Sequence, residues 1–151
     1  MPMQGYGVVF EHEILFRDID AMGHVNNVTF VAFMEDARMK YWKALRQKTG
    51  LKKINFILAE VRCIYKSPAY LGETLRIGIR ACRLGGKSFH FEYRMEESKS
   101  GRLVVEGSSI QVMYDYQQQQ SVQIDEATRQ GMAAIEGVPL ESLQSRNSPG
   151  S

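Results

Sequence analysis

The sequence predicts an α+β domain in which an antiparallel sheet of about five strands wraps around one long central helix. Two observations carry this prediction. Apolar residues follow a helical spacing in one long stretch, whereas five other stretches alternate apolar and polar residues as half-buried strands do. Four of these stretches follow the helix in hairpin-like succession, and that order favours antiparallel pairing.

The first predicted elements are a strand and the long helix. Residues 8–16 alternate apolar side chains with polar neighbours, which is the period of a strand. From Phe30 to Leu45 apolar residues recur at helical spacing, and Gly50 is a stop signal. We therefore expect one helix of about 20 residues.

The remaining strands come after this helix. Alternating sets cover residues 57–65, 75–81 and 89–95, and a last strand runs from about 102 to 116. Gly107 and the two serines after it thin out the side chains of the last strand enough for a bulge or bend. Asp125 can then cap a short helix that reaches about Ile135.

We expect a single domain over residues 1–136 and a disordered tail over residues 137–151, where small and polar residues dominate. A lone sheet of about five strands leaves its edges uncovered, and proteins often solve this by pairing across a two-fold axis. A homodimer is therefore expected.

The composition excludes several functions. The 19 basic and 17 acidic residues give a net charge of +2, too balanced for a protein whose main partner is a nucleic acid. The cysteines are too few for a disulfide framework and the histidines too scattered for a metal site, so no metal and no cofactor are expected. Because no run of about 18 apolar residues occurs, we expect no membrane span and a cytoplasmic location.

Chemistry-bearing side chains concentrate in residues 16–27, between the first strand and the helix. This segment holds two aspartates, a glycine, a histidine and two asparagines. One interpretation is purely structural: Asn26 or Asn27 caps the helix, Gly23 makes a turn, and Asp18 and Asp20 favour the turn.

The functional interpretation starts from the same segment. A helix N-terminus presents unpaired N–H groups that suit an oxyanion developing on a thioester carbonyl. Asp20 lies a few residues before the helix start, where its carboxylate could attack that carbonyl or deprotonate a water.

The motif D-x-x-G-H-V-N-N at residues 20–27, followed by M-E-D-A-R at 34–38, resembles the hot-dog thioesterases of the 4-hydroxybenzoyl-CoA thioesterase and YbgC-like family. It is also similar to the acyl-acyl-carrier-protein thioesterases. The stretches K-S-P-A-Y-L-G-E at 66–73 and R-L-G-G-K-S-F at 83–89 extend the resemblance, which covers roughly residues 8–115.

This resemblance implies a hot-dog fold and hydrolysis of an acyl-CoA to a free acid and CoA. Asp20 would be the catalytic carboxylate, as nucleophile or general base, and backbone amides near Asn27 and Val28 would bind the thioester oxygen. Family members form dimers, often paired into tetramers, with each acyl site between two subunits. A homodimer or homotetramer is therefore implied.

Two further residues are catalytic candidates. His24 could orient the carboxylate, accept a proton or contact substrate, because its ring takes both charge states near neutral pH; alternatively it bonds the loop backbone. Glu35 lies on the helix, from which some hot-dog thioesterases supply their carboxylate, although an ion pair with Arg38 three residues later is the favoured interpretation.

The candidate substrate-binding residues are mostly cationic, since ammonium and guanidinium groups bind the phosphates of CoA. Ser67 is included as a side chain that could approach the site from a partner subunit, although a turn-forming serine is the open alternative. Asn26 is included from the same motif as Asp20. The set comprises Asn26, Lys66, Ser67, Arg83 and Lys87.

Three other functions stay open at this point: an acyl-acyl-carrier-protein thioesterase, a hot-dog enoyl-CoA hydratase, and a non-catalytic acyl-CoA-binding module. The hydratases usually carry a Gly-Asp-x-Asn-Pro run, which this sequence lacks. The retention of Asp20 beside a helix start argues against the binding module.

Overall fold

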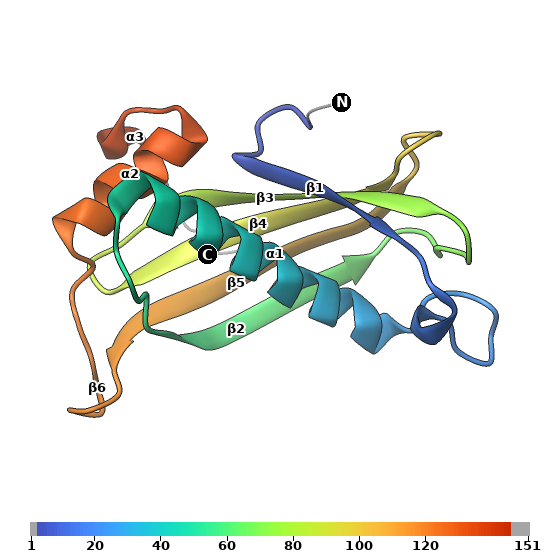
Figure 1. The fold of residues 1–151 in the computed structure, drawn as a ribbon, viewed down its shortest axis with the longest axis horizontal. Helices are drawn as coiled ribbons and strands as arrows, with labels where there is room; N and C mark the ends of the chain where they lie inside the picture. The colour runs from blue at the N-terminus through green and yellow to red at the C-terminus, as the bar shows by residue number, and fades with distance from the viewer. Residues whose placement is uncertain (1–2, 146–151) are drawn as a thin grey trace.

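The computed structural model describes residues 3–145, and its long elements follow the predicted order (Figure 1). The long helix and the strands of the main sheet are α1 (Asn27–Thr49), β1 (Val8–Glu13), β2 (Phe56–Tyr65), β3 (Thr74–Leu84), β4 (Ser88–Glu97) and β5 (Leu103–Asp115). The shorter elements are the 3₁₀ turn η1 (Phe16–Asp18), β6 (Gln120–Ser121), α2 (Glu126–Glu136) and α3 (Leu140–Gln144).

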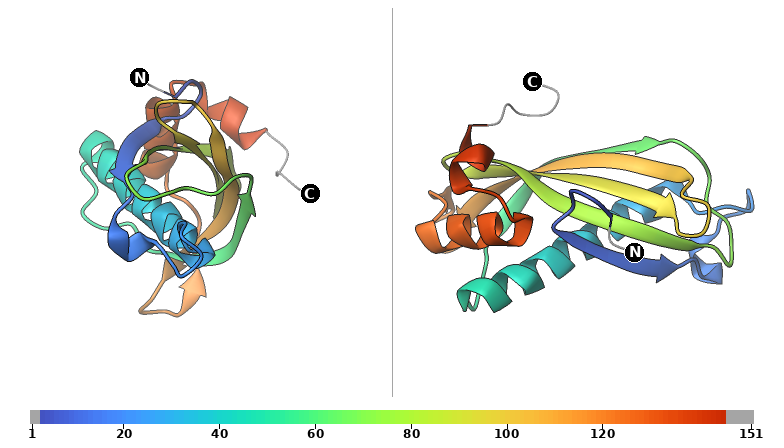
Figure 2. Two further views of the ribbon diagram at one scale, coloured as in Figure 1. Left: turned by 90° about the vertical axis from the view of Figure 1, so that its right-hand side faces the viewer. Right: turned by 90° about the horizontal axis from the view of Figure 1, so that it is seen from above.

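The sheet has the order β1-β3-β4-β5-β2, with every neighbouring pair antiparallel, and β6 adds a short pairing to β5. Figure 2 shows the twisted sheet curving along one side of α1. The predicted hot-dog architecture, a sheet wrapped around one long helix, is confirmed.

Helix α1 begins and ends at strong capping residues. The Asn26 side chain accepts a hydrogen bond from Val28 N at its start, and Gly50 closes it with a left-handed φ of 75°. Its buried residues recur every three to four positions, so one face packs against the sheet. That face consists of Phe30, Phe33, Met34, Ala37, Arg38, Tyr41, Trp42 and Leu45.

The sheet face that meets α1 is lined by alternating residues of β3 and β4. These side chains are at most 1% exposed, and they are Leu75, Ile77, Ile79, Ala81, Phe89, Phe91, Tyr93 and Met95. Trp42 joins this core through an edge-on contact with Phe89 and a tilted contact with Phe91, whose ring centroids lie 5.5 and 5.6 Å away. Burial of this face fixes the position of α1 across the sheet.

The small residues of β5 have a different role from the one predicted. The register runs unbroken through Gly107 and the serines that follow it, and β2 bulges instead between Leu58 and Glu60. A Cβ atom at Gly107 would lie 2.9 Å from the methyl carbon of Met34. The glycine therefore allows α1 to approach β5 closely.

The C-terminal segment also differs from its prediction. Disorder was expected from residue 137, but residues 140–144 form α3, and Leu143 is fully buried against the main core. The expectation is therefore wrong for residues 137–145, because Leu143, with the partly buried Val138 and Leu140, packs against the core and anchors the short helix. Residues 146–151 lie outside the described part of the chain.

Helix α2 is held to the sheet by the half-buried carboxylate of Glu136. The Tyr41 hydroxyl donates to Glu136 Oε2 at 2.7 Å, and Ala81 N donates to the same oxygen at 2.9 Å. Burial raises the pKa of Glu136 above its ordinary value, more than these two donors lower it.

No helix within residues 3–145 is long and apolar enough to cross a membrane.

Replacing Leu143 with Ala should lower the free energy of unfolding by about 2–5 kcal/mol, because the change leaves a cavity in the core. Chemical denaturation monitored by circular dichroism measures this. The exposed Gln144→Ala on the same helix is the matched control, with an expected change within about 0.5 kcal/mol. Equal stability of both variants would show that α3 is not anchored.

Replacing Glu136 with Gln should make stability less sensitive to rising pH. A carboxyl group whose pKa is raised in the folded state contributes stability that is complete below its unfolded pKa of about 4.3 and is lost as pH rises through the folded pKa. The variant should therefore gain stability relative to the wild type between about pH 4 and pH 8. Urea unfolding at both pH values measures the difference, and a gain toward acid pH would contradict the assignment.

Candidate functional site

The segment between β1 and α1 folds into a tight turn around Asp20. Asp20 N donates to His24 O at 3.1 Å, and Gly23 N donates to Asp20 O at 3.0 Å. Asp20 Oδ1 accepts a hydrogen bond from Met22 N at 2.9 Å. Gly23 takes a φ of 85°, which a side chain would disfavour. These are the turn roles that the structural interpretation assigned to Asp20 and Gly23.

A second aspartate, Asp18, anchors the loop to β1. Its carboxylate is buried, accepts a bond from Leu15 N at 2.9 Å, and lies 3.0 Å from His12 Nε2 on β1. Its carbonyl oxygen accepts from Asn26 N at 3.1 Å, and Val25 N donates to Ala69 O at 2.9 Å. The sequence predicts only a turn role for Asp18 and carries no signal for its pairing with His12.

The start of α1 distinguishes the two backbone amides predicted to bind the thioester oxygen. Val28 N donates to Asn26 Oδ1 at 2.8 Å, so this N–H group is already occupied. Asn27 N has no hydrogen-bond acceptor among residues 3–145. Because a helix start carries a partial positive charge, Asn27 N–H is the donor suited to an incoming oxygen.

Asp20 lies beside this helix start. Its Oδ2 accepts a bond from Asn26 Nδ2 at 3.4 Å, and the residue is half-buried. An ionised carboxylate offers about four acceptor positions, so the bonds from Met22 N and Asn26 leave room for a water or a substrate atom.

His24 does not bond the Asp20 carboxylate. Its Nδ1 lies 3.2 Å from Val25 O, which is the loop-backbone role named as the alternative. If Nδ1 carries the proton for that bond, Nε2 is left as an acceptor.

Four predicted residues come together in a pocket of about 300 Å³ beside the helix start: His24, Asn27, Lys66 and Ser67. The other lining residues are Val25, Phe30, Tyr65 and Pro68. Tyr65, which was predicted only as a strand residue, donates from its hydroxyl to Asn27 O at 3.0 Å. The pocket thus combines an apolar wall with an amide donor, an imidazole and an ammonium group.

Ser67 lines this pocket from its own chain, and its hydroxyl makes turn contacts, the alternative to an approach from a partner subunit. Its hydroxyl donates to Leu103 O at 2.7 Å and accepts from Arg102 Nε at 3.3 Å. Arg102 also binds both carboxylate oxygens of Glu73, at 2.7 and 3.1 Å, and this guanidinium lowers the pKa of Glu73. The Ser67 hydroxyl therefore stabilises the turn after β2.

Three other candidates, Arg83, Lys87 and Glu35, lie away from the pocket. Asp20, Asn26 and Val28 adjoin the helix start without lining the pocket. Arg83 and Lys87 are at the β3–β4 turn, next to α2 and at the opposite end of the sheet from the Asp20 loop (Figure 1). Glu35 is exposed on α1, about 12 Å along the helix axis from Asn27. The expected Glu35–Arg38 ion pair is wrong, because Arg38 is buried and donates to the Tyr93 hydroxyl at 3.1 Å.

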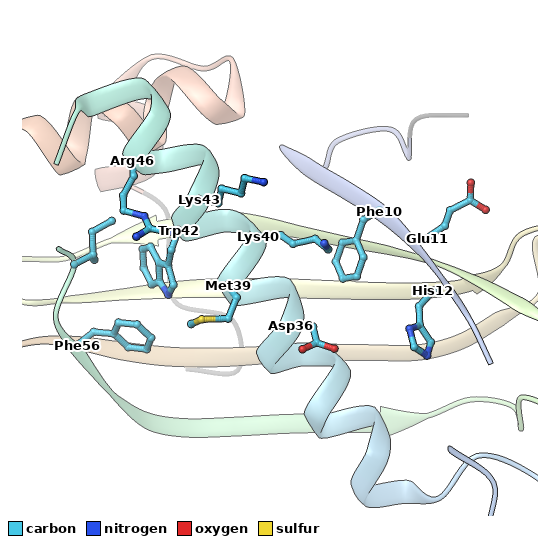
Figure 3. Close-up of a pocket in the computed structure, with 11 residues that line it drawn as sticks. Phe10, Glu11, His12, Asp36, Met39, Lys40, Trp42, Lys43, Arg46 and Phe56 are labelled. Carbon is cyan, nitrogen blue, oxygen red and sulfur yellow. The ribbon is translucent and has the colours of Figure 1, made fainter. Parts of the chain in front are cut away.

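A larger hollow of about 580 Å³ lies along the outer face of α1 (Figure 3). Trp42 and Phe56 are on one side of the helix, and Phe10 and His12 are on the other. The Trp42 indole N–H is buried without a hydrogen-bond partner among the described residues. The hollow contains none of the predicted site residues, and no group of three or more metal-binding side chains occurs within residues 3–145.

Comparison with known proteins agrees with this architecture. A thioesterase from Thermus thermophilus, solved in complex with coenzyme A and Zn, has a TM-score of 0.78 and 29% identity, covering 91% of this chain and 99% of that one. The long-chain acyl-CoA thioesterase FadM of Escherichia coli (strain K12) is 25% identical over 117 residues, which are 74% of this chain and 86% of that protein. The uncharacterized protein YsmA of Bacillus subtilis (strain 168) is 28% identical over 116 residues, 74% of this chain and 78% of that protein.

These matches confirm the predicted hot-dog thioesterase family, while the YbgC-like subfamily stays a prediction. The profile of the thioesterase-like superfamily matches residues 14–132, which include the Asp20 loop, α1 and the main sheet from β2 to β5. The chain therefore belongs to the thioesterase-like superfamily.

Proposed function

We propose that this protein hydrolyses acyl-CoA thioesters to a free acid and CoA. One observation carries the proposal: a carboxylate, Asp20, is tied through Asn26 to a helix whose first N–H group, at Asn27, has no partner among the described residues. Membership of the thioesterase-like superfamily and the similarity to an acyl-CoA thioesterase support the reaction type and the substrate class.

The reaction needs an oxyanion donor and a carboxylate. The thioester oxygen would accept a hydrogen bond from Asn27 N–H, whose strength grows as negative charge develops on that oxygen; one such donor typically lowers the barrier by about 3 kcal/mol. Asp20 then either attacks the carbonyl carbon, expelling the CoA thiolate and leaving an anhydride that water cleaves, or removes a proton from an attacking water. Both routes consume one water and release an acid and a thiol.

The pocket at the helix start suits the reacting end of the substrate. Phe30, Tyr65 and Val25 offer apolar contact to the acyl carbons, and Lys66 supplies a cation for the CoA arm. At about 300 Å³ the pocket is too small for a whole acyl-CoA. Arg83 and Lys87 would reach the same CoA only if a second copy brought its opposite sheet end near.

A second copy is proposed to pair along β2. This strand has β5 on one side only, and five of its apolar side chains are 37–45% exposed: Ile57, Leu58, Val61, Ile64 and Tyr65. A long apolar edge strand is a template for pairing with another chain. Antiparallel pairing about a two-fold axis would give a homodimer with one continuous sheet; a homotetramer remains an expectation from the resemblance.

Such pairing would also extend the site. It would bring Phe56 of one copy near Tyr65 of the other, because the two residues lie at opposite ends of β2, about 30 Å apart. The hollow beside Trp42 and Met39 of one copy would then adjoin the helix start of the other. An acyl chain too long for the smaller pocket would have apolar surface to occupy there.

Asp20→Asn should reduce kcat by about 10²–10⁴-fold, because the amide keeps the size of the side chain and loses the charge. Release of free thiol from aromatic, short-chain and long-chain acyl-CoAs measures the activity. Glu141→Gln, which alters an exposed carboxylate on α3 away from both hollows, is the matched control. Full activity of a folded Asp20→Asn protein, or loss in Glu35→Gln alone, would contradict the assignment.

Val61→Lys should weaken the dimer by at least about tenfold in Kd, since pairing along β2 would bury the introduced charge. Analytical ultracentrifugation over a range of concentrations measures the equilibrium. Leu71→Lys changes an exposed apolar residue outside β2 and should leave the equilibrium unaltered. A wild-type protein that is monomeric throughout would remove this interface.

A further inference from the structure

The side chain of Asn26 lies between the candidate carboxylate and the start of α1. Its Oδ1 accepts from Val28 N at 2.8 Å, and its Nδ2 donates to Asp20 Oδ2 at 3.4 Å. One amide therefore satisfies a helix N–H group and contacts a carboxylate six residues earlier. A helix cap alone requires only the first of these two bonds.

The orientation of this amide is determined by its neighbours. Val28 N–H can only donate, so the atom facing it must be the Asn26 oxygen. The NH₂ group must then point away from the helix, toward Asp20. An ionised carboxylate accepts such a bond, which makes the pair chemically consistent.

The backbone of Asn26 is held as firmly as its side chain. Asn26 N donates to Asp18 O at 3.1 Å, and Asp18 itself is anchored by Leu15 N and by His12 on β1. Thr29 N donates to Asn26 O at 2.9 Å on the helix side. Asn26 thus forms a bridge between a fixed loop and a fixed helix.

We propose that Asn26 is a positioning residue that holds the Asp20 carboxylate in register with the Asn27 N–H group, rather than a residue that contacts substrate. This inference rests on the proposed thioesterase function. Both groups must meet one carbonyl, and displacement of a reacting group by about 1 Å can cost about a hundredfold in rate. A single amide that links the carboxylate to the helix start keeps their separation constant.

The test separates the helix-capping role of Asn26 from its hydrogen bond to Asp20. Asn26→Ser retains an oxygen that can cap α1, but its short side chain cannot reach Asp20 as a donor. We expect the melting temperature to stay close to that of the wild type, with kcat for acyl-CoA hydrolysis reduced about tenfold to a hundredfold and KM nearly unchanged. Asn26→Ala, which loses both bonds, should lower the melting temperature as well.

Helix α2 provides the matched control. Its cap, Asp125, accepts from Thr128 N at 2.7 Å and is remote from the Asp20 loop. Asp125→Ser makes an equivalent cap exchange and should leave kcat within twofold of the wild type. If Asn26→Ser also keeps kcat within twofold, Asn26 is only a cap and the proposal is wrong.

Asn26→Asp adds a second measurement, the pH–rate profile, which should not change if Asn26 only caps the helix. Aspartate caps helices well, but here it places a second carboxylate against Asp20, so ionisation of the pair becomes harder. The acid limb of the pH–rate profile should therefore shift to higher pH. The variant substitutes none of the other titratable groups of the loop and of the elements packed against it. These are His12, Asp18, His24, Tyr65, Lys66, Tyr70 and Glu73.

A measurement without turnover keeps the two proposals distinct. In the wild type, the NMR signals of the Asn26 side-chain amide should titrate with the Asp20 carboxylate and should change in Asp20→Asn. If these amide signals respond neither to pH nor to Asp20→Asn, the proposed hydrogen bond between Asn26 and Asp20 is refuted, even when the enzyme is active. A wild type that releases no thiol from any acyl thioester would instead refute the proposed function, and the amide signals would still test the hydrogen bond.

Discussion

Burial of one face of α1 against the curved sheet is the constraint on which the rest of the structure depends. The helix contributes large side chains such as Tyr41, Trp42 and Leu45 to a core that β3 and β4 complete. Because these contacts fix the helix, its first turn always emerges at the same place, between the Asp20 loop and the end of β2. Gly107 allows the close approach to β5 that this packing needs.

Polar anchors then build the site on this framework. Asp18 holds the loop through His12 and Leu15, and Arg102 holds the turn after β2 through Glu73. Neither anchor places its own side chain in the pocket at the helix start. The residues that do line it inherit their positions from these neighbours, and the Asp20 carboxylate, which lies outside that lining, is held beside the helix start by Asn26.

Much of this arrangement could be predicted from the sequence. Apolar periodicity identified α1 and the long strands, since side-chain patterns of 2 and 3.6 residues follow directly from burial on one face. The D-x-x-G-H-V-N-N motif identified the loop and the helix start. The sequence could not assign hydrogen-bond partners, because these depend on side-chain directions: Val28 N–H is occupied by Asn26, His24 turns to a backbone carbonyl, and Arg38 points into the core instead of toward Glu35. The anchoring of Leu143 was hidden by its polar neighbours.

The hydrogen bond from the Tyr65 hydroxyl to Asn27 O joins the last residue of β2 to the first residue of α1. The strand edge proposed to pair with a second copy is thereby connected to the residue whose N–H group is proposed to bind the thioester oxygen. The same hydrogen bond would then link the dimer interface to the helix start. Separation of the subunits on dilution would therefore disturb the geometry of the helix start. Specific activity would in that case fall as the protein is diluted and the dimer dissociates.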